Sequence, residues 1–213
     1  MTEQLDMFSI PDPIEEKVTS RDIQVPGLEY VADYIAEDEA RSLESRIDHD
    51  EGVWIHDLKR RVQHYGYKYD YKARRIDKKM HLGELPSWGK DLACKLHSDG
   101  YFEREPDQII VNEYLPKQGI AKHTDCVPCF DDTIASLSLL NPVVMDFFAN
   151  PNTKQKSEIL LAPRSLIVLK GVARHKWLHG IRARVNHEHA GEIYPLKRRI
   201  SLTFRSVILD GKH

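Results

Sequence analysis

The sequence predicts an α+β fold that is predominantly β: a double-stranded β-helix, or jelly roll, with helices before it. Two observations support this class. After Gly100, short apolar or alternating runs follow one another and are separated by glycine and proline, as in sheets built from many short strands. Before Gly100, apolar residues recur at helical spacing. A chain of 213 residues also suits one domain of ordinary size.

The predicted domain covers residues 21–213 and follows a flexible tail at residues 1–20, which is polar and has no sustained period. Residues 21–106 are expected to form helices and a flap, and residues 107–213 the jelly-roll core. The predicted strands are residues 108–115, 133–140, 143–149, 158–161, 165–170 and 199–208.

Two segments are predicted to be helical. Residues 27–48 should form one or two packing helices, and the acidic residues at 37–39 favour a helix start there, because they face the positive end of the helix dipole. A further helix should begin at Pro86, with Ser87 as its cap, and end at Gly100. We expect it to be structural.

Between these helices, residues 54–71 alternate aromatic with cationic and polar residues, and Gly66 permits a tight turn. This pattern predicts two short strands or a loop-rich flap.

The charge is unevenly distributed along the chain, although the net charge is only -2. Residues 58–81 hold nine Lys and Arg against two Asp, and residues 164–205 hold ten against two Glu. The net charges of +7 and +8 leave -17 on the remainder. A basic face for a polyanion is the interpretation that we favour, and solvated cations on an ordinary surface are the alternative.

The sequence also indicates a soluble, cytoplasmic protein. No run of about 18 apolar residues could span a membrane, and the first residues lack the pattern of a secretory signal. The three cysteines are too few for a disulfide framework, in agreement with a reducing compartment. We expect a monomer.

The strongest chemical signal is His123-Thr124-Asp125. On an extended chain, residues two apart project to the same face, so His123 and Asp125 could bind one metal. With His179 they would form the two-histidine, one-carboxylate facial triad of non-haem Fe(II) oxygenases. Taken alone, the triplet is more often a surface histidine near a surface aspartate.

The last predicted strand alternates in character. Arg199, Ser201, Thr203 and Arg205 share one face, and apolar residues occupy the other. The polar face should line a site, where the two guanidinium groups could bind a small diacid, or simply face water.

Four motifs occur in an order and spacing that resemble the AlkB family of Fe(II)- and 2-oxoglutarate-dependent dioxygenases. They are Asn112-x-Tyr114, His123-x-Asp125, His179-Gly180 and Arg199-x5-Arg205, within residues 108–207. The resemblance implies that His123, Asp125 and His179 bind Fe(II). It also implies that the 2-oxoglutarate-binding residues are Asn112, Tyr114, Arg199 and Arg205.

The resemblance further implies an oxidative demethylase of N-alkylated nucleobases in RNA, tRNA included, or in single-stranded DNA. Such an enzyme uses O2 and yields formaldehyde, succinate and CO2. The alternatives are a 2-oxoglutarate-dependent hydroxylase of a tRNA base modification, a protein or a small molecule, and a binding module without activity.

The resemblance implies a nucleotide-recognition flap in the aromatic and basic segment before residue 76. The amino-acid sequence of this segment is more similar to family branches that include RNA-directed members. Aromatic rings would stack on a base there, and cations would bind phosphates. The alternative is an aromatic hairpin packed on the core. The substrate-binding candidates are Arg61, His64, Tyr65, Tyr67, Tyr69, Lys72, Arg74 and Arg75.

Two features depart from the family. Val127 stands where some DNA-repairing members have an acidic residue that addresses the base. Cys126 and Cys129 flank it; we interpret them as buried thiols, with a zinc site completed by His187 and His189 as the alternative. His175, four residues before His179, is expected not to bind metal.

Overall fold

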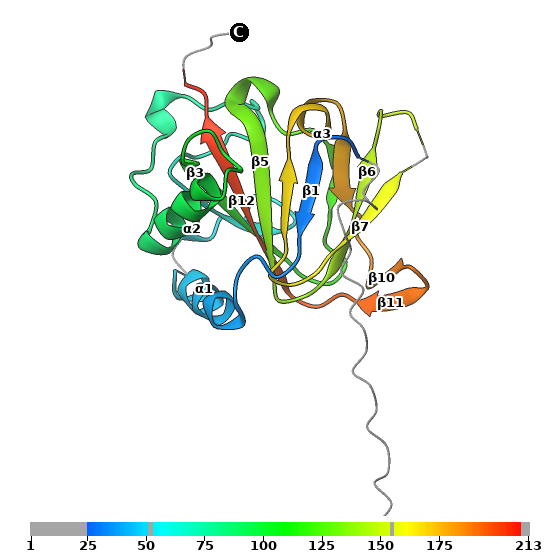
Figure 1. The fold of residues 1–213 in the computed structure, drawn as a ribbon. Helices are drawn as coiled ribbons and strands as arrows, with labels where there is room; N and C mark the ends of the chain where they lie inside the picture. Colours follow the sequence, from blue (N-terminus) through cyan, green and yellow to red (C-terminus); the bar gives the residue numbers. More distant parts are fainter. Residues whose placement is uncertain (1–24, 51–52, 154–155, 210–213) are drawn as a thin grey trace, which may run out of the picture.

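A computed structural model of the protein describes residues 25–50, 53–153 and 156–209. Two antiparallel sheets face each other, and helices cover the outer face of the larger one (Figure 1). The larger sheet has six strands in the order β1 (Leu28–Val31), β8 (Leu166–Leu169), β5 (Phe130–Leu139), β12 (Arg199–Val207), β3 (Gln108–Tyr114) and β2 (Arg61–Tyr65). The smaller has the order β4 (Ile120–His123), β9 (Leu178–Ile181), β6 (Val143–Phe148) and β7 (Ser157–Leu161).

The remaining elements are short or lie outside these sheets. They are the hairpin β10 (Asn186–His189) and β11 (Glu192–Pro195), the helices α1 (Glu37–His49), α2 (Ser87–Ser98) and α3 (Gly171–His175), and the 3-10 turns η3 (Lys78–Met80) and η4 (Val127–Cys129). No helix in the described ranges is long and apolar enough to cross a membrane.

One hydrophobic core lies between the six-stranded sheet and the two longer helices. The alternate residues Ile200, Leu202 and Phe204 of β12 are fully buried there, against apolar side chains of α1 and α2. The polar residues of β12 lie on the opposite face and line a cavity between the sheets. The predicted alternation of this strand is confirmed, and it separates the core from the site.

A second core fills the space between the two sheets. Phe147 of β6 and Leu161 of β7 are fully buried there, with Ile167 and Leu169 of β8 opposite them. This core closes the end of the sandwich away from β2 and leaves the cavity near β12, β3 and β4.

The predicted jelly-roll class is confirmed, and all six predicted strands are present with ends that differ by a few residues. The helical prediction for residues 27–48 is wrong in its first part. Leu28–Val31 is strand β1, which pairs with β8 because this pairing satisfies its backbone at the sheet edge. The helix begins at Glu37 as the acidic residues indicated, and the Glu39 carboxylate accepts a hydrogen bond from Ala36 N.

Other expectations differ in detail. Ser87 is the first helical residue of α2 rather than its cap, since Pro86 occupies the cap position. Residues 54–71 form one edge strand, β2, and an irregular stretch after Gly66 with isolated bridges Tyr67↔His81 and Asp70↔Arg75. The predicted tail at residues 1–20 lies outside the described residues.

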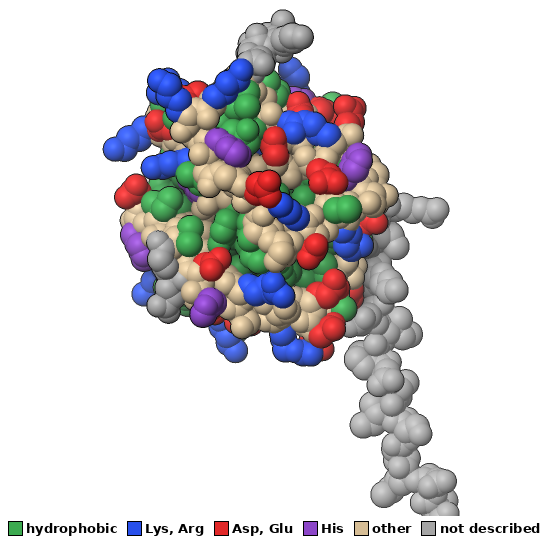
Figure 2. All heavy atoms as spheres, turned by 90° about the vertical axis from the view of Figure 1, so that its left-hand side faces the viewer, with side chains coloured by type: hydrophobic (Ala, Val, Ile, Leu, Met, Phe, Trp, Pro, Cys, Tyr) green, Lys and Arg blue, Asp and Glu red, His purple; other side chains and the backbone are tan. Residues whose placement is uncertain are grey.

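Among the described residues, the face of the molecule seen in Figure 2 has no large patch of one charge sign. Figure 2 shows acidic and basic side chains interleaved over this face. The basic sequence segments therefore do not make this side a continuous basic surface, and the arginines that concern the site lie in the cavity.

Candidate metal and cosubstrate site

His123, Asp125 and His179 lie together. Each offers one ligand atom, and these atoms all lie within 4.8 Å of one another. His123 and His179 are paired across β4 and β9, with ring centres 4.6 Å apart. Gly180 permits this approach: a Cβ at Gly180 would lie 3.0 Å from the backbone oxygen of Ile120.

The protonation states of these groups suit a metal. The Nδ1–H of His123 donates to the carbonyl of Ala121 at 2.9 Å, so Nε2 is the ring nitrogen left for a metal. Burial lowers the pKa of His179 to about 4, so the ring is neutral at pH 7. Its Nε2 lies 3.6 Å from the Asp125 carboxylate. Two imidazole rings and a carboxylate match the donor set of a non-haem iron site, so the residues fit Fe(II).

Asp125 is held from two sides. Its carboxylate accepts a hydrogen bond from Arg205 Nη2, and its backbone carbonyl accepts one from Arg174 Nη1 at 3.1 Å. Burial alone would raise the pKa of Asp125, but its Coulombic interaction with Arg205 outweighs this effect, helped by smaller ones with His179, His123 and Arg174. The pKa therefore lies below its usual range. The carboxylate is therefore ionised at neutral pH.

Arg174 is a buried organiser of this region that sequence reasoning missed. It is 2% exposed, and besides Asp125 its guanidinium donates to the carbonyls of Cys126 at 3.0 Å and Phe130 at 3.4 Å. It fixes the turn between the metal residue and β5. A single arginine within a short helix carries no sequence signal for this role.

A cavity of about 350 Å³ extends from the three potential metal ligands between the sheets. At its inner end lies Arg199, which is 2% exposed. Its Nη2 donates to Ser138 Oγ at 2.9 Å, whereas its Nε and Nη1 are buried without a partner in the described structure. Burial lowers the pKa of Arg199 to about 10, so it stays charged at pH 7. The two nitrogens of Arg199 that lack a partner could donate hydrogen bonds to a carboxylate, such as one of those of 2-oxoglutarate.

The other implied cosubstrate residues line the same cavity. The guanidinium of Arg199 lies 5.5 Å from the ring centre of Tyr114. Asn112 is two residues from Tyr114 on the same face of β3, and its Oδ1 accepts a hydrogen bond from Arg60 Nε at 2.8 Å. The apolar part of the wall includes Ile110, Ile120, Ile134, Met145, Ile167, Leu169 and Ile181.

The flap candidates differ in where they lie. Tyr69 and Arg74 line the cavity, and Arg74 donates to the Thr124 carbonyl at 3.2 Å. His64 is buried behind the wall. Tyr67 packs on His81 with ring centres 4.8 Å apart. The exposed Lys72 and Arg75 do not line the cavity.

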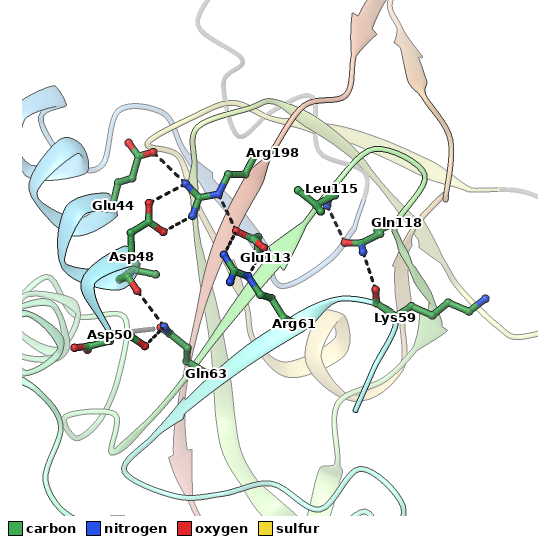
Figure 3. Close-up of polar contacts among 11 residues, drawn as sticks. Glu44, Asp48, Asp50, Lys59, Arg61, Gln63, Glu113, Leu115, Gln118 and Arg198 are labelled. Carbon is green, nitrogen blue, oxygen red and sulfur yellow. Dashed lines mark hydrogen bonds and ion pairs between the residues drawn. The ribbon is translucent and has the colours of Figure 1, made fainter. Parts of the chain in front are cut away.

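Arg61 and Tyr65 face the opposite side of β2, because the side chains of a strand alternate. Arg61 Nε donates to the buried Glu113 carboxylate at 2.5 Å, which Arg198 also contacts, within a network that reaches Asp48 of α1 (Figure 3). Tyr65 packs on Trp88 with ring centres 5.2 Å apart. The structure does not bring these two candidates to the cavity.

Arg60 and Tyr71 also line the cavity, although they were absent from the predicted substrate set. Both belong to the aromatic and basic segment, so composition pointed to the right stretch. Strand parity would have favoured Arg60 over Arg61 only if the position of β2 in the sheet had been known.

The cysteine interpretation is corrected. Cys126 and Cys129 form a disulfide rather than two free thiols. Zinc finds no support there either, because His187 accepts from Val144 N at 3.0 Å and donates to the Arg182 carbonyl at 2.9 Å. His175 Nε2 lies 2.7 Å from an Asp132 carboxylate oxygen, and His175 is not among the three clustered residues, so its lack of a metal role stays a prediction.

The fold and the donor set define a class, the non-haem iron oxygenases, and the comparison with known families agrees. The 2OG-Fe(II) oxygenase superfamily matches residues 33–205, and the chain belongs to it. A mimivirus relative named uncharacterized protein L905 is 35% identical over 86% of each chain. An Arabidopsis thaliana relative named alkylated DNA repair protein ALKBH8 homolog is 32% identical over 93% of this chain.

A Xenopus tropicalis relative named tRNA (carboxymethyluridine(34)-5-O)-methyltransferase alkbh8 is 36% identical over 85% of this chain. The chain spans 63% of the Arabidopsis relative and 32% of the Xenopus one. Within the superfamily, the chain belongs to the AlkB family and is an Fe(II)- and 2-oxoglutarate-dependent dioxygenase.

Solved structures agree on the fold. The structure of OsALKBH1 has a TM-score of 0.61 at 15% identity, covering 85% of this chain and 97% of that one. A Pseudomonas putida prolyl-4-hydroxylase has a TM-score of 0.54 at 13% identity, covering 84% and 92%.

Proposed function

We propose that this dioxygenase removes an alkyl group from a nucleobase of RNA, tRNA included, or of single-stranded DNA. The observation that carries the proposal is the lining of the cavity, which Tyr69, Tyr71 and Arg74 share with the three potential iron ligands. Stacking rings beside a guanidinium suit an unstacked base and its phosphate. The relatives named for alkylated DNA repair and for tRNA support the same class of substrate.

In the proposed reaction, a methyl group, 2-oxoglutarate and O2 give a hydroxymethyl group, succinate and CO2. The hydroxymethyl group on nitrogen then breaks its C–N bond, releasing formaldehyde and the unmodified base. When bound, Fe(II) supplies the O2-dependent oxidation of the C–H bond.

The residues of the chain position this chemistry. His123, Asp125 and His179 would hold the iron, and Arg205 keeps the Asp125 carboxylate ionised and in place. Arg199 would bind the distal carboxylate of 2-oxoglutarate through its unpaired nitrogens. The apolar walls exclude water from the reacting atoms.

A second candidate is stable hydroxylation of a modified tRNA base, in which the oxidised carbon is bound to carbon and nothing is released. The relative named for carboxymethyluridine in tRNA favours including it. Hydroxylation of a protein or a small molecule is a further alternative. We also propose that the enzyme acts as a monomer.

Mass spectrometry of nucleosides tests these proposals. Methylated tRNA and methylated single-stranded DNA are incubated with the enzyme, Fe(II), ascorbate and 2-oxoglutarate. Loss of a methyl group with stoichiometric formaldehyde supports demethylation, and a gain of one oxygen supports stable hydroxylation. Succinate formation without any nucleic acid change would contradict both.

A further inference from the structure

Most of the charged side chains that line the cavity are positive. Arg60, Arg74, Arg199 and Arg205 line it, whereas Asp125 is the one carboxylate among the described lining residues. Arg205 is paired with Asp125, and Arg199 is in position for the cosubstrate. Arg60 and Arg74 are therefore two cations without a carboxylate partner in the part of the chain that the structure describes.

Arg60 is fixed inside the cavity. Its Nε donates to Asn112 Oδ1 at 2.8 Å, and its guanidinium carbon lies 5.6 Å from the ring centre of Tyr114. These two contacts hold the plane of the guanidinium, and they leave both Nη groups as donors. The residue is half-buried, so its charge acts in a medium that screens less than water.

Tyr71 is a second oriented donor. Nδ1 of His64 accepts from Tyr69 N at 3.3 Å, so the proton of the neutral ring lies on Nε2. Burial keeps the ring neutral by lowering the pKa of His64 to about 4. Nε2 lies 3.3 Å from the Tyr71 hydroxyl and donates to it. The Tyr71 hydroxyl proton is then free to donate into the cavity that this residue lines.

We propose that the cavity selects a nucleobase of uracil or guanine type, which carries carbonyl oxygens and no positive charge. Arg60 and Tyr71 are its specificity-determining residues, and His64 is the positioning residue for Tyr71. This inference rests on the proposed function, which it deepens.

The chemistry of alkylated bases explains the selection. Adenine alkylated at N1 and cytosine alkylated at N3 are cations at neutral pH and present an amino donor beside the alkyl group. Uracil alkylated at N3 and guanine alkylated at N1 are neutral and present an oxygen there. Hydrogen-bond donors, and arginines without a carboxylate partner among the described residues, favour the uracil and guanine bases and disfavour the cationic ones. Val127 is 44% exposed, lies outside the cavity lining and supplies no carboxylate to reverse this preference.

Binding tests the inference independently of turnover. Two RNA oligonucleotides of identical sequence carry a single 3-methyluridine or a single 3-methylcytidine, bases that differ only in oxygen against amino group and in charge. Fluorescence anisotropy is measured with the Fe(II) and 2-oxoglutarate complex without O2. We expect the 3-methyluridine oligonucleotide to bind tighter by about tenfold or more. A hydrogen bond from a charged group to the base oxygen contributes enough binding free energy for a difference of this size. Equal binding, or tighter binding of 3-methylcytidine, would overturn the inference.

Variants assign the residues. Arg60→Gln and Tyr71→Phe should each lower the binding ratio, whereas Arg41→Gln on the exposed face of α1 should leave it unchanged. If His64 acts through Tyr71, His64→Phe lowers the binding ratio of the two oligonucleotides. In a double variant with Tyr71→Phe, it then lowers the ratio little further. Full additivity would show that His64 does not position Tyr71. Should a variant fail to fold, the wild-type ratio still decides the base selectivity.

The two proposals fail in different ways. If neither oligonucleotide nor any methylated tRNA or DNA is turned over when O2 is admitted, the proposed function is overturned. If turnover occurs with no preference in binding, only the base selectivity is overturned.

Discussion

At the scale of single residues, the site depends on groups that are buried and charged at once. Asp125 stays ionised because its electrostatic interactions, above all with Arg205, outweigh the effect of its burial. Arg199 is likewise a buried cation with two unpaired nitrogens. A buried charge destabilises the fold unless it is paired, and here a bound ligand would complete the pairing. Removing either side chain should therefore affect the binding of iron or 2-oxoglutarate before it affects stability.

We predict that His123→Ala and Asp125→Ala each abolish iron binding and succinate formation, because two remaining ligands do not hold Fe(II) in an open site. The measurements are iron content after dialysis and succinate release. His175→Ala is the matched control and should keep both, since His175 pairs with Asp132 instead. Full turnover in either triad variant would contradict the metal assignment.

We predict that Arg199→Lys raises the KM for 2-oxoglutarate by about tenfold to a hundredfold and changes kcat less, because the lysine ammonium lacks the planar, two-point geometry of the guanidinium. Initial rates over a range of 2-oxoglutarate concentrations check this. Arg164→Lys at the surface ion pair with Asp33 serves as the control. An unchanged KM would remove Arg199 from the cosubstrate site.

At the scale of elements, sequence reasoning succeeded where a strand has one core face and failed where packing decides. The alternation of β12 placed Arg199 and Arg205 on one face. The four-residue strands β1 and β9 are too short to show a period, and they become strands because neighbouring edges satisfy their backbones. The sequence showed that His123 and Asp125 could lie on one face. Their closeness to His179 could not be predicted from the sequence, because it depends on the pairing of β4 with β9.

The turn between Asp125 and β5 yields a stability prediction. Arg174→Ala should lower the free energy of unfolding by about 2–4 kcal/mol, because three backbone carbonyls lose a charged donor in a buried place. Urea denaturation measures it, with Arg46→Ala on the exposed face of α1 as the control. A loss below that of the control would show that the carbonyls find other donors.

At the scale of the whole molecule, the buried histidines set the dependence of stability on pH. The folded-state pKa of His64 is about 4, below the value of about 6.5 expected in the unfolded chain. The unfolded state therefore binds more protons between these values, and stability falls as pH drops through this window. His179 acts in the same direction in the metal-free protein.

We predict that the metal-free protein loses about 2 kcal/mol of unfolding free energy through His64 alone between pH 7 and pH 5. Urea denaturation at the two pH values measures the loss, and His64→Gln should reduce it by that amount. An identical loss in the variant would mean that other groups control the acid sensitivity.

The alternation of β12 has a consequence for how the enzyme can fail. Its odd-numbered residues from 199 to 205 face the cavity, and the even-numbered ones between them form the core. A slip of one residue in pairing would place the arginines among the helices and the apolar side chains in the cavity. A misaligned β12 would therefore lose its core packing and its cosubstrate-binding arginines together. A population of molecules should therefore contain folded, binding-competent chains and unfolded ones, with no folded form in which β12 alone is misaligned.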